Sequence, residues 1–142
     1  MTCTFFGHRD CPETIRPKLR AALENLIATH HVTQFYVGNQ GRFDAMARHT
    51  LRELAETYPP ISYHIVLAYP PCKRDIENFE NNIHMVLPKD IETVPKRFAV
   101  FHRNRWMVEQ ADYVVTYVTR SYGGAAQFAA LAERKGKIMV KI

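Results

Sequence analysis

ADYVVTYVTRSYGGAAQFAALA, residues 111–132, sets an apolar run, a double glycine and an alanine-rich run in succession. The β-branched and aromatic residues of 112–118 predict a buried strand, and the alanine-rich run predicts a helix. Gly123 and Gly124 at the junction permit a tight turn and leave the N–H groups of the helix start open to a ligand. Such a turn favours an anion or phosphate site, although glycine at a turn also serves steric needs alone. We include Ser121 of the same turn among the candidate ligand-binding residues.

The same succession of strand and helix runs through the whole chain. Hydrophobic periodicity predicts strands at 2–6, 33–37, 61–68, 112–118 and 137–142, with a further short candidate at 84–87. It predicts helices at 14–30, between 43 and 55, at 96–110, and from 124 to about 135. Strict alternation requires crossover connections. We therefore expect a single domain over residues 1–142, a three-layer α/β structure with a mostly parallel sheet and helices on both faces.

The composition bounds the class of protein and of ligand. Of 142 residues, 46% are hydrophobic and 23% charged, as in a globular protein large enough for one core. No run has the length of a membrane span and no signal-peptide pattern begins the chain, so we expect a cytoplasmic protein without membrane contact. The net charge of +5 favours anionic ligands without choosing among nucleotides, nucleic acids and phosphorylated metabolites. Cys3, Cys11 and Cys72 fit a reducing compartment, and no disulfide framework or metal site is predicted.

Glycines and polar residues follow the predicted strands, and ligands bind at strand carboxyl ends in parallel α/β sheets. After the first strand, Gly7 permits a close backbone approach. His8 offers a hydrogen-bond donor or an acid–base group, and Arg9 offers a bidentate clamp for phosphate or carboxylate. The alternative for this loop is a plain glycine turn with an exposed arginine.

The loop after the second strand is a second candidate anion site. Gly38, Asn39 and Gly41 precede a helix whose dipole favours an anion. The third glycine of the dinucleotide fingerprint is missing. Asp44 is either an acceptor for ribose hydroxyls or a first-turn acid with only a dipole role, and the sequence leaves these two roles open.

Arg103 and Asn104 lie in the helix predicted at 96–110. Arg103 shares a helix face with Met107, while Arg105 and Trp106 point elsewhere. The arginines are either a solvated face or, if the helix borders the crevice, part of the ligand site. We expect Trp106 and Met107 in the core rather than stacked on a ligand. The expected inward side chains also include Phe98, Phe101, Val108 and Ala111.

Four segments taken together resemble the SLOG superfamily, and most closely its YpsA-like branch, often found in Gram-positive bacteria and their phages. They are CTFFGHR at 3–9, GRFD at 41–44, RNRWMVEQAD at 103–112 and the glycine pair at 123–124, and the resemblance spans residues 3–142. It implies a Rossmann-like domain that binds a nucleotide or nucleotide-derived ligand, contacted by Arg9, Asp44 and Arg103. The glycines implied to shape the site are Gly7, Gly38, Gly41, Gly123 and Gly124.

The superfamily includes the cytokinin-activating phosphoribohydrolases and the DNA-binding core of the DNA-processing protein DprA. The phosphoribohydrolases carry a Pro-Gly-Gly-x-Gly-Thr-x-x-Glu motif with a catalytic glutamate. Aligned on Gly123 and Gly124, this chain has Tyr122 for the proline and Ala130 for the glutamate. The resemblance therefore implies a site that keeps an arginine but lacks the general acid/base of those enzymes.

The leading expectation is a protein that senses, carries or sequesters a nucleotide-like anion. One alternative is N-glycosidic hydrolysis of a nucleoside phosphate, with His8 or Asp44 in place of the missing glutamate. A DNA-associated role is the other, and the lack of a basic stripe interleaved with aromatic residues disfavours it. We identify no cofactor besides a possible nucleotide-like ligand. Because relatives of this fold pair through helix faces, we expect a homodimer, with Phe101, Trp106 and the 70–95 segment supplying apolar surface.

Overall fold

The described strands form one parallel sheet. The structure is a computed structural model that describes residues 1–74 and 84–142. Strand order is β4-β3-β2-β1-β5-β6, and each neighbouring pair is parallel. The strands are β1 (Thr2–Gly7), β2 (Gln34–Val37), β3 (Ser62–Val66), β4 (Met85–Val86), β5 (Tyr113–Tyr117) and β6 (Ile138–Lys141). All six predicted strands are confirmed, with ends that differ by one or two residues.

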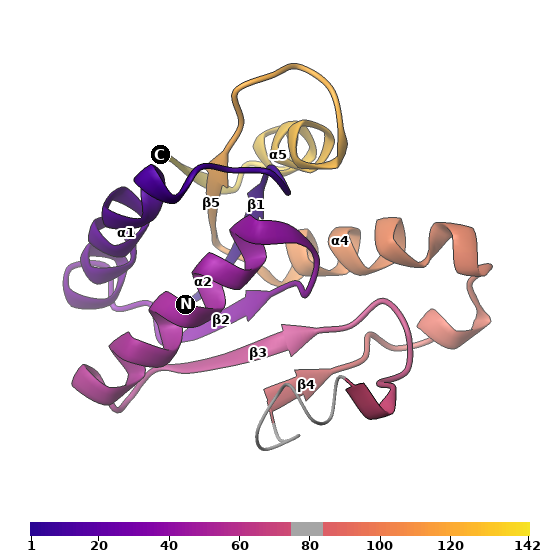
Figure 1. Ribbon diagram of the computed structural model, residues 1–142, viewed down its shortest axis with the longest axis horizontal. Coiled ribbons are helices and arrows are strands. Elements are labelled where there is room, and N and C mark those ends of the chain that lie inside the picture. The colour runs from indigo at the N-terminus through magenta and orange to yellow at the C-terminus, as the bar shows by residue number, and fades with distance from the viewer. Residues whose placement is uncertain (75–83) are drawn as a thin grey trace.

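Helices cover both faces of the sheet, as Figure 1 shows. The described α-helices are α1 (Arg16–Ala28), α2 (Gly41–Thr57), α4 (Ala99–Gln110) and α5 (Gly124–Arg134). Short 3₁₀ turns at Glu13–Ile15, Ile91–Thr93 and Lys96–Phe98 lead into helices or loops. The side chains of α1 and α2 pack in one core cluster, and those of α4 and α5 pack in another. The expected three-layer α/β arrangement is therefore confirmed.

Neighbouring residues of β1 supply the two cores. Successive side chains of a strand point to opposite faces. Phe5 stacks against Phe35 under α1 and α2, with ring centroids 6.2 Å apart. Phe6 stacks against Phe128 of α5, with centroids 5.6 Å apart. One strand thus holds both helix layers to the sheet.

Two predicted core residues of α4 are exposed instead. Phe98 and Phe101 are 50% and 44% exposed. Residues Lys96–Phe98 form a 3₁₀ turn, and the α-helix begins only at Ala99, so the helical spacing does not extend back to Phe98. The Phe101 ring meets only the edge of Phe128, at a centroid distance of 5.1 Å.

The other expectations for α4 are confirmed in most respects. Met107, Val108 and Ala111 are buried. Trp106 is half-buried, and its ring lies edge-on to Tyr36 with centroids 5.0 Å apart. Residues 75–83, part of the segment expected to supply dimer surface, lie outside the described residues.

The chain changes direction across the sheet between β1 and β5. From β1 it runs outward through β2 and β3 to β4, and α4 then carries it back to β5 on the other side of β1. The chain therefore passes from β1 to α1 on one face and from β5 to α5 on the other, and such a reversal favours a crevice at the carboxyl ends of the two strands. Among the described residues, no helix has both the length and the apolar character needed to cross a bilayer.

Candidate functional site

A pocket of about 370 Å³ lies at this crevice. The loops expected to converge, those after β1, β2 and β5, all contribute to it, and α4 forms a further wall. Its polar and glycine lining consists of residues 7–10, Gln40, Asp44, Arg103, Asn104, Arg120, Gly123 and Gly124. The sequence predicted that these loops would converge at the carboxyl ends of the strands.

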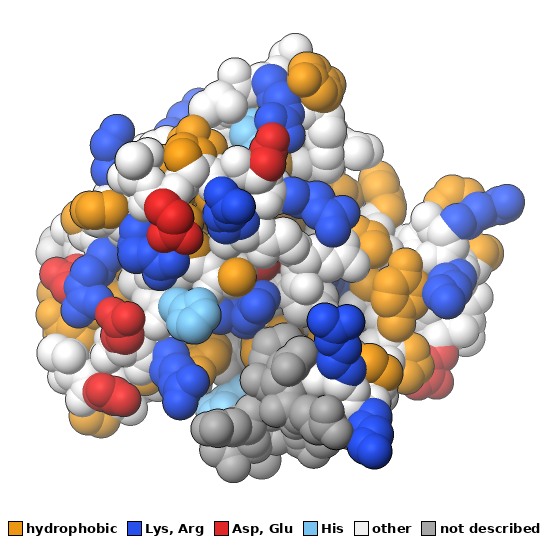
Figure 2. Space-filling model, viewed as in Figure 1, with side chains coloured by type: hydrophobic (Ala, Val, Ile, Leu, Met, Phe, Trp, Pro, Cys, Tyr) orange, Lys and Arg blue, Asp and Glu red, His pale blue; other side chains and the backbone are white. Residues whose placement is uncertain are grey.

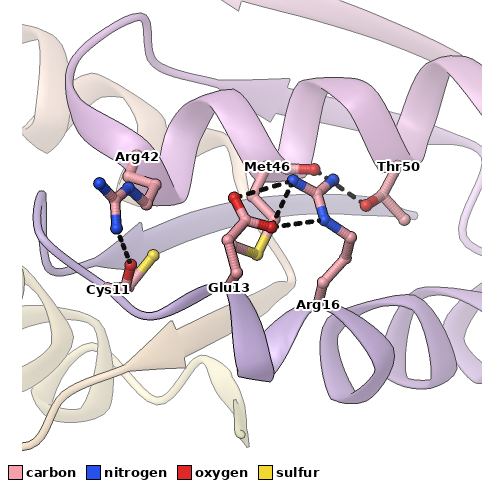
Figure 3. Close-up of polar contacts among 6 residues, drawn as sticks. All are labelled: Cys11, Glu13, Arg16, Arg42, Met46 and Thr50. Atoms are coloured by element: carbon pink, nitrogen blue, oxygen red, sulfur yellow. Dashed lines mark hydrogen bonds and ion pairs between the residues drawn. The ribbon is translucent and has the colours of Figure 1, made fainter.

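The loop after β1 is fastened to the start of α2. The Arg42 N–H donates to the Arg9 carbonyl (2.9 Å), and Arg42 Nη1 donates to the Cys11 carbonyl (3.3 Å), as Figure 3 shows for Cys11. Gly41 has a φ of +86°, and a Cβ there would lie 2.8 Å from the Arg9 Cα. These contacts fix the backbone of Arg9. Its side chain is exposed and forms no hydrogen bond or ion pair with a described residue.

Figure 3 also shows how α1 and α2 lie beside this loop. Glu13 and Arg16 form an ion pair (3.0 Å) where α1 begins. Thr50 turns its hydroxyl back to the Met46 carbonyl of its own helix (2.8 Å). Neither contact reaches the pocket, so this neighbourhood supports the β1 loop and contributes no ligand-facing group beyond it.

His8 joins the loops after β1 and β5. It is buried, and its Nε2 accepts a hydrogen bond from the Thr119 N–H (2.9 Å). Burial, together with the nearby Arg120 charge, lowers the pKa of His8, and the Asp10 carboxylate opposes this shift. A ring nitrogen that accepts a backbone hydrogen bond belongs to a neutral imidazole. Nε2 is therefore engaged in holding two loops together and is not free for acid–base work.

Arg103 is a buried connector beneath the pocket. Its Nη1 donates to Asn39 Oδ1 (3.2 Å) and to the Val66 carbonyl (3.3 Å), and its Nε donates to Asn104 Oδ1 (2.9 Å). It is 3% exposed, and Nη2 has no hydrogen-bond partner among the described residues. Arg103 therefore ties α4 to the ends of β2 and β3 and keeps part of its guanidinium for the pocket.

Asp44 accepts a backbone hydrogen bond at the start of α2 and also lines the pocket. Its Oδ2 accepts the Gln40 N–H at the start of α2 (3.0 Å), and the half-buried side chain also lines the pocket. Loss of hydration raises the pKa of Asp44, while the Arg103 charge and the Gln40 hydrogen bond oppose that shift. A Cβ on Gly38 would lie 2.6 Å from Asp44 Oδ2 and 3.0 Å from Arg103 Nη1. Glycine at 38 therefore lets these opposite charges flank the backbone.

The two helix starts expected to hold an anion differ in how many of their N–H groups have acceptors. At α2, the N–H groups of Gln40 and Arg42 are engaged by Asp44 and by the Arg9 carbonyl. At α5, Gly123 has a φ of +94° and no side chain caps the helix. The described residues provide no acceptor for the N–H groups of the first turn, which a helix leaves unsatisfied. The start of α2 therefore keeps fewer N–H groups for an anion than the start of α5.

The remaining predicted residues do not line this pocket. Gly38, Asn39 and Gly41 do not line the pocket, although Asn39 accepts a hydrogen bond from Arg103, which does. Ser121 is exposed and lines a second cavity of about 380 Å³ on the far side of Arg120. Ala130, at the position of the phosphoribohydrolase glutamate, also lines that second cavity.

Two charged residues of the pocket were missed by the sequence reasoning. Asp10 and Arg120 line it and form an ion pair (3.2 Å) between the loops after β1 and β5. Both follow a strand end within a few residues, so the rule that singled out Arg9 could have included them. Among residues 1–74 and 84–142, no group of His, Cys, Asp or Glu has the arrangement to hold a metal ion.

No protein-family model matches the chain, and no curated protein matches it significantly. The chemistry of the site is therefore interpreted from its own geometry.

Proposed function

We propose that this protein binds a nucleotide or a nucleotide-derived anion in the pocket between β1 and β5. The observation that carries the proposal is that the open start of α5 and the side chain of Arg9 line one pocket. Unsatisfied N–H groups and the helix dipole attract an anion. The Arg9 side chain adds a charge that no described carboxylate neutralises by an ion pair. Together, the start of α5 and the Arg9 side chain favour binding of a phosphoryl group in this pocket.

The lining around Asp44 favours hydroxyl groups rather than a second anion. Asp44 faces the pocket with one oxygen, Oδ1, that accepts no hydrogen bond from a described residue. A carboxylate accepts hydrogen bonds from sugar hydroxyls and repels phosphate. Asn104, which also lines the pocket, supplies a further amide group. A ligand with a phosphate at one end and a sugar at the other fits this asymmetry, and the volume lies in the range of about 300–1,000 Å³ typical of small-molecule sites.

The surface supports a small ligand rather than a nucleic acid. Figure 2 shows Lys and Arg side chains spread over the face in view and mixed with Asp and Glu. Proteins that track single strands gather basic side chains along a groove and place aromatic rings between them. The charge on this face does not follow that pattern.

Calorimetric titration with nucleoside monophosphates tests the proposal. Adenosine serves as the uncharged ligand control, and native mass spectrometry of protein from its own cells identifies any retained ligand. Arg9→Ala removes one charge-assisted contact of about 1.5–3 kcal/mol, so we expect affinity to fall about tenfold or more. Arg105→Ala is the matched control, since Arg105 is exposed, pairs with Glu109 and does not line the pocket.

Two results would overturn the proposal. One is the absence of nucleotide binding at millimolar concentration. The other is equal affinity for adenosine and its monophosphate, because the proposed site recognises the phosphoryl group. Equal effects of Arg9→Ala and Arg105→Ala would place the ligand elsewhere on the protein.

A second candidate is hydrolysis of the N-glycosidic bond by water, which releases free base and ribose 5-phosphate. The observation in its favour is Asp44, a carboxyl group in the pocket wall whose pKa is raised by burial, because a raised pKa favours a carboxyl group as general acid or base. Incubation with nucleoside monophosphates and assay for both products separates the two candidates. Release that disappears in Asp44→Asn supports the enzyme, and retention of intact nucleotide supports the binding protein.

We also propose a homodimer. Phe98 and Phe101 expose apolar surface at the start of α4, and Figure 2 shows hydrophobic and basic side chains together on the side where Figure 1 places this helix start. Trp106, which packs against Tyr36, contributes less of this surface than expected.

A further inference from the structure

Arg120 occupies an incompletely satisfied position in the wall of the pocket. Its Nη2 lies 3.2 Å from Asp10 Oδ1, and its Nη1 lies 3.5 Å from Asp10 Oδ2. Both distances exceed the roughly 2.7–2.9 Å of a strong N⁺–H···O⁻ bond. The two side chains are 36% and 73% exposed, and exposed ion pairs contribute only about 0–1 kcal/mol. The ion pair between Asp10 and Arg120 is therefore weak.

The third nitrogen of the Arg120 guanidinium, Nε, has no hydrogen-bond partner among the described residues. Arg120 Nε is buried and forms no hydrogen bond to a described residue. A guanidinium only donates hydrogen bonds, and a buried donor without an acceptor is unfavourable. The resting arrangement thus leaves a binding group unused at the edge of the pocket.

The surroundings of Arg120 favour an anion that offers more acceptors than Asp10. Arg120 and the open start of α5 line the same pocket, and a phosphoryl group carries three acceptor oxygens. The Thr119 N–H bond to His8 (2.9 Å) holds the loop next to β1. The Tyr122 ring lies 5.5 Å from the Arg120 guanidinium carbon. A change of partner therefore requires rotation of the arginine side chain and not movement of the loop.

We propose that Arg120 recognises the phosphoryl group of the ligand and that Asp10 holds Arg120 in the ligand-free protein. Ligand binding exchanges the Asp10 carboxylate for the phosphoryl oxygens, so Asp10 competes with the ligand. This inference rests on the proposed function and assigns a specific anion-recognition residue to the same pocket.

Titration of adenosine monophosphate into four variants tests the exchange. We expect Arg120→Gln to weaken binding about tenfold or more, by loss of a charge-assisted contact. Asp10→Asn removes the competing partner of Arg120, so affinity should rise about two- to fivefold. The double variant should bind as weakly as Arg120→Gln, because the gain acts through the arginine. Arg134→Gln, an exposed arginine of α5 outside the pocket, is the charge-matched control.

The outcomes separate this inference from the proposed function. If wild-type protein binds and Arg120→Gln binds equally well, the exchange is wrong and the proposed function stands. Weaker binding by Asp10→Asn would likewise overturn it, since Asp10 would then assist the ligand. If wild-type protein does not bind adenosine monophosphate, the proposed site and the exchange fall together.

Discussion

Gly7→Ala would place a methyl group against the ring of Phe43. A Cβ built on Gly7 lies less than 3.0 Å from three ring carbons of Phe43. The ring is fully buried where α2 passes over the end of β1. It therefore cannot rotate into solvent to relieve the overlap. Overpacking of a core costs about 1–3 kcal/mol, and overlap with three atoms places this variant near the upper value. At that cost, the melting temperature of a protein of this size falls by about 6–12 °C.

Urea denaturation of matched variants measures this effect. Gly124→Ala is the control, because a Cβ there meets nothing within 4 Å, and alanine at a compatible position stabilises by about 0.4–1 kcal/mol. Adding Phe43→Leu to Gly7→Ala should recover part of the loss, with a coupling energy of about 0.5–3 kcal/mol. A Gly7→Ala protein as stable as wild type would refute the reasoning, and so would an additive double variant.

Three further predictions concern Arg103, His8 and the start of α4. Arg103→Met leaves the Asn39, Asn104 and Val66 acceptors without their donor, so the free energy of unfolding should drop by about 1–3 kcal/mol; an unchanged urea midpoint would contradict the connector role. The pKa of His8 lies below its ordinary 6.5 in the folded protein. The neutral ring is therefore favoured by folding, and stability is lost as the pH falls below about 6.5 toward the lower folded value. His8→Gln should lose less stability than wild type between about pH 7.5 and pH 5, with the remaining loss including His64, whose pKa is also lowered by burial; identical losses would mean that His8 does not titrate with folding. Phe101→Ser should convert the expected dimer to a monomer in light scattering at tens of micromolar, and a wild-type protein of monomer mass would refute the dimer.

The expected fold followed from local patterns. Apolar β-branched runs such as 112–118 and the helical spacing between 43 and 55 depend on residues close in sequence, and strict alternation admits few topologies. The error at Phe98 has a local cause that the pattern does not contain. Phe98 lies in a 3₁₀ turn at Lys96–Phe98 before α4 begins, so the helical spacing does not apply to it.

In the candidate site, local sequence patterns identify residues but not the partners that these residues contact. Glycines and charged residues after the strands identified Arg9, Asp44 and the start of α5, since parallel strands bring their carboxyl ends to one edge. Whether a group at that edge is free depends on its partners. Arg42 engages the Arg9 carbonyl, which is 33 positions away in sequence, and Asp10 holds Arg120 across 110 positions.

The sequence by itself determined the α/β class, the number and order of the strands, and the edge of the sheet where polar residues gather. Periodicity and glycine placement are properties of short segments, and these features depend on them. Only the tertiary structure decided which N–H groups at the starts of α2 and α5 have acceptors, that His8 Nε2 and Arg103 act largely as connectors, and that Arg120 lines the pocket. Hydrogen bonds and burial at these groups involve partners from distant segments, and only the packed chain brings those segments together.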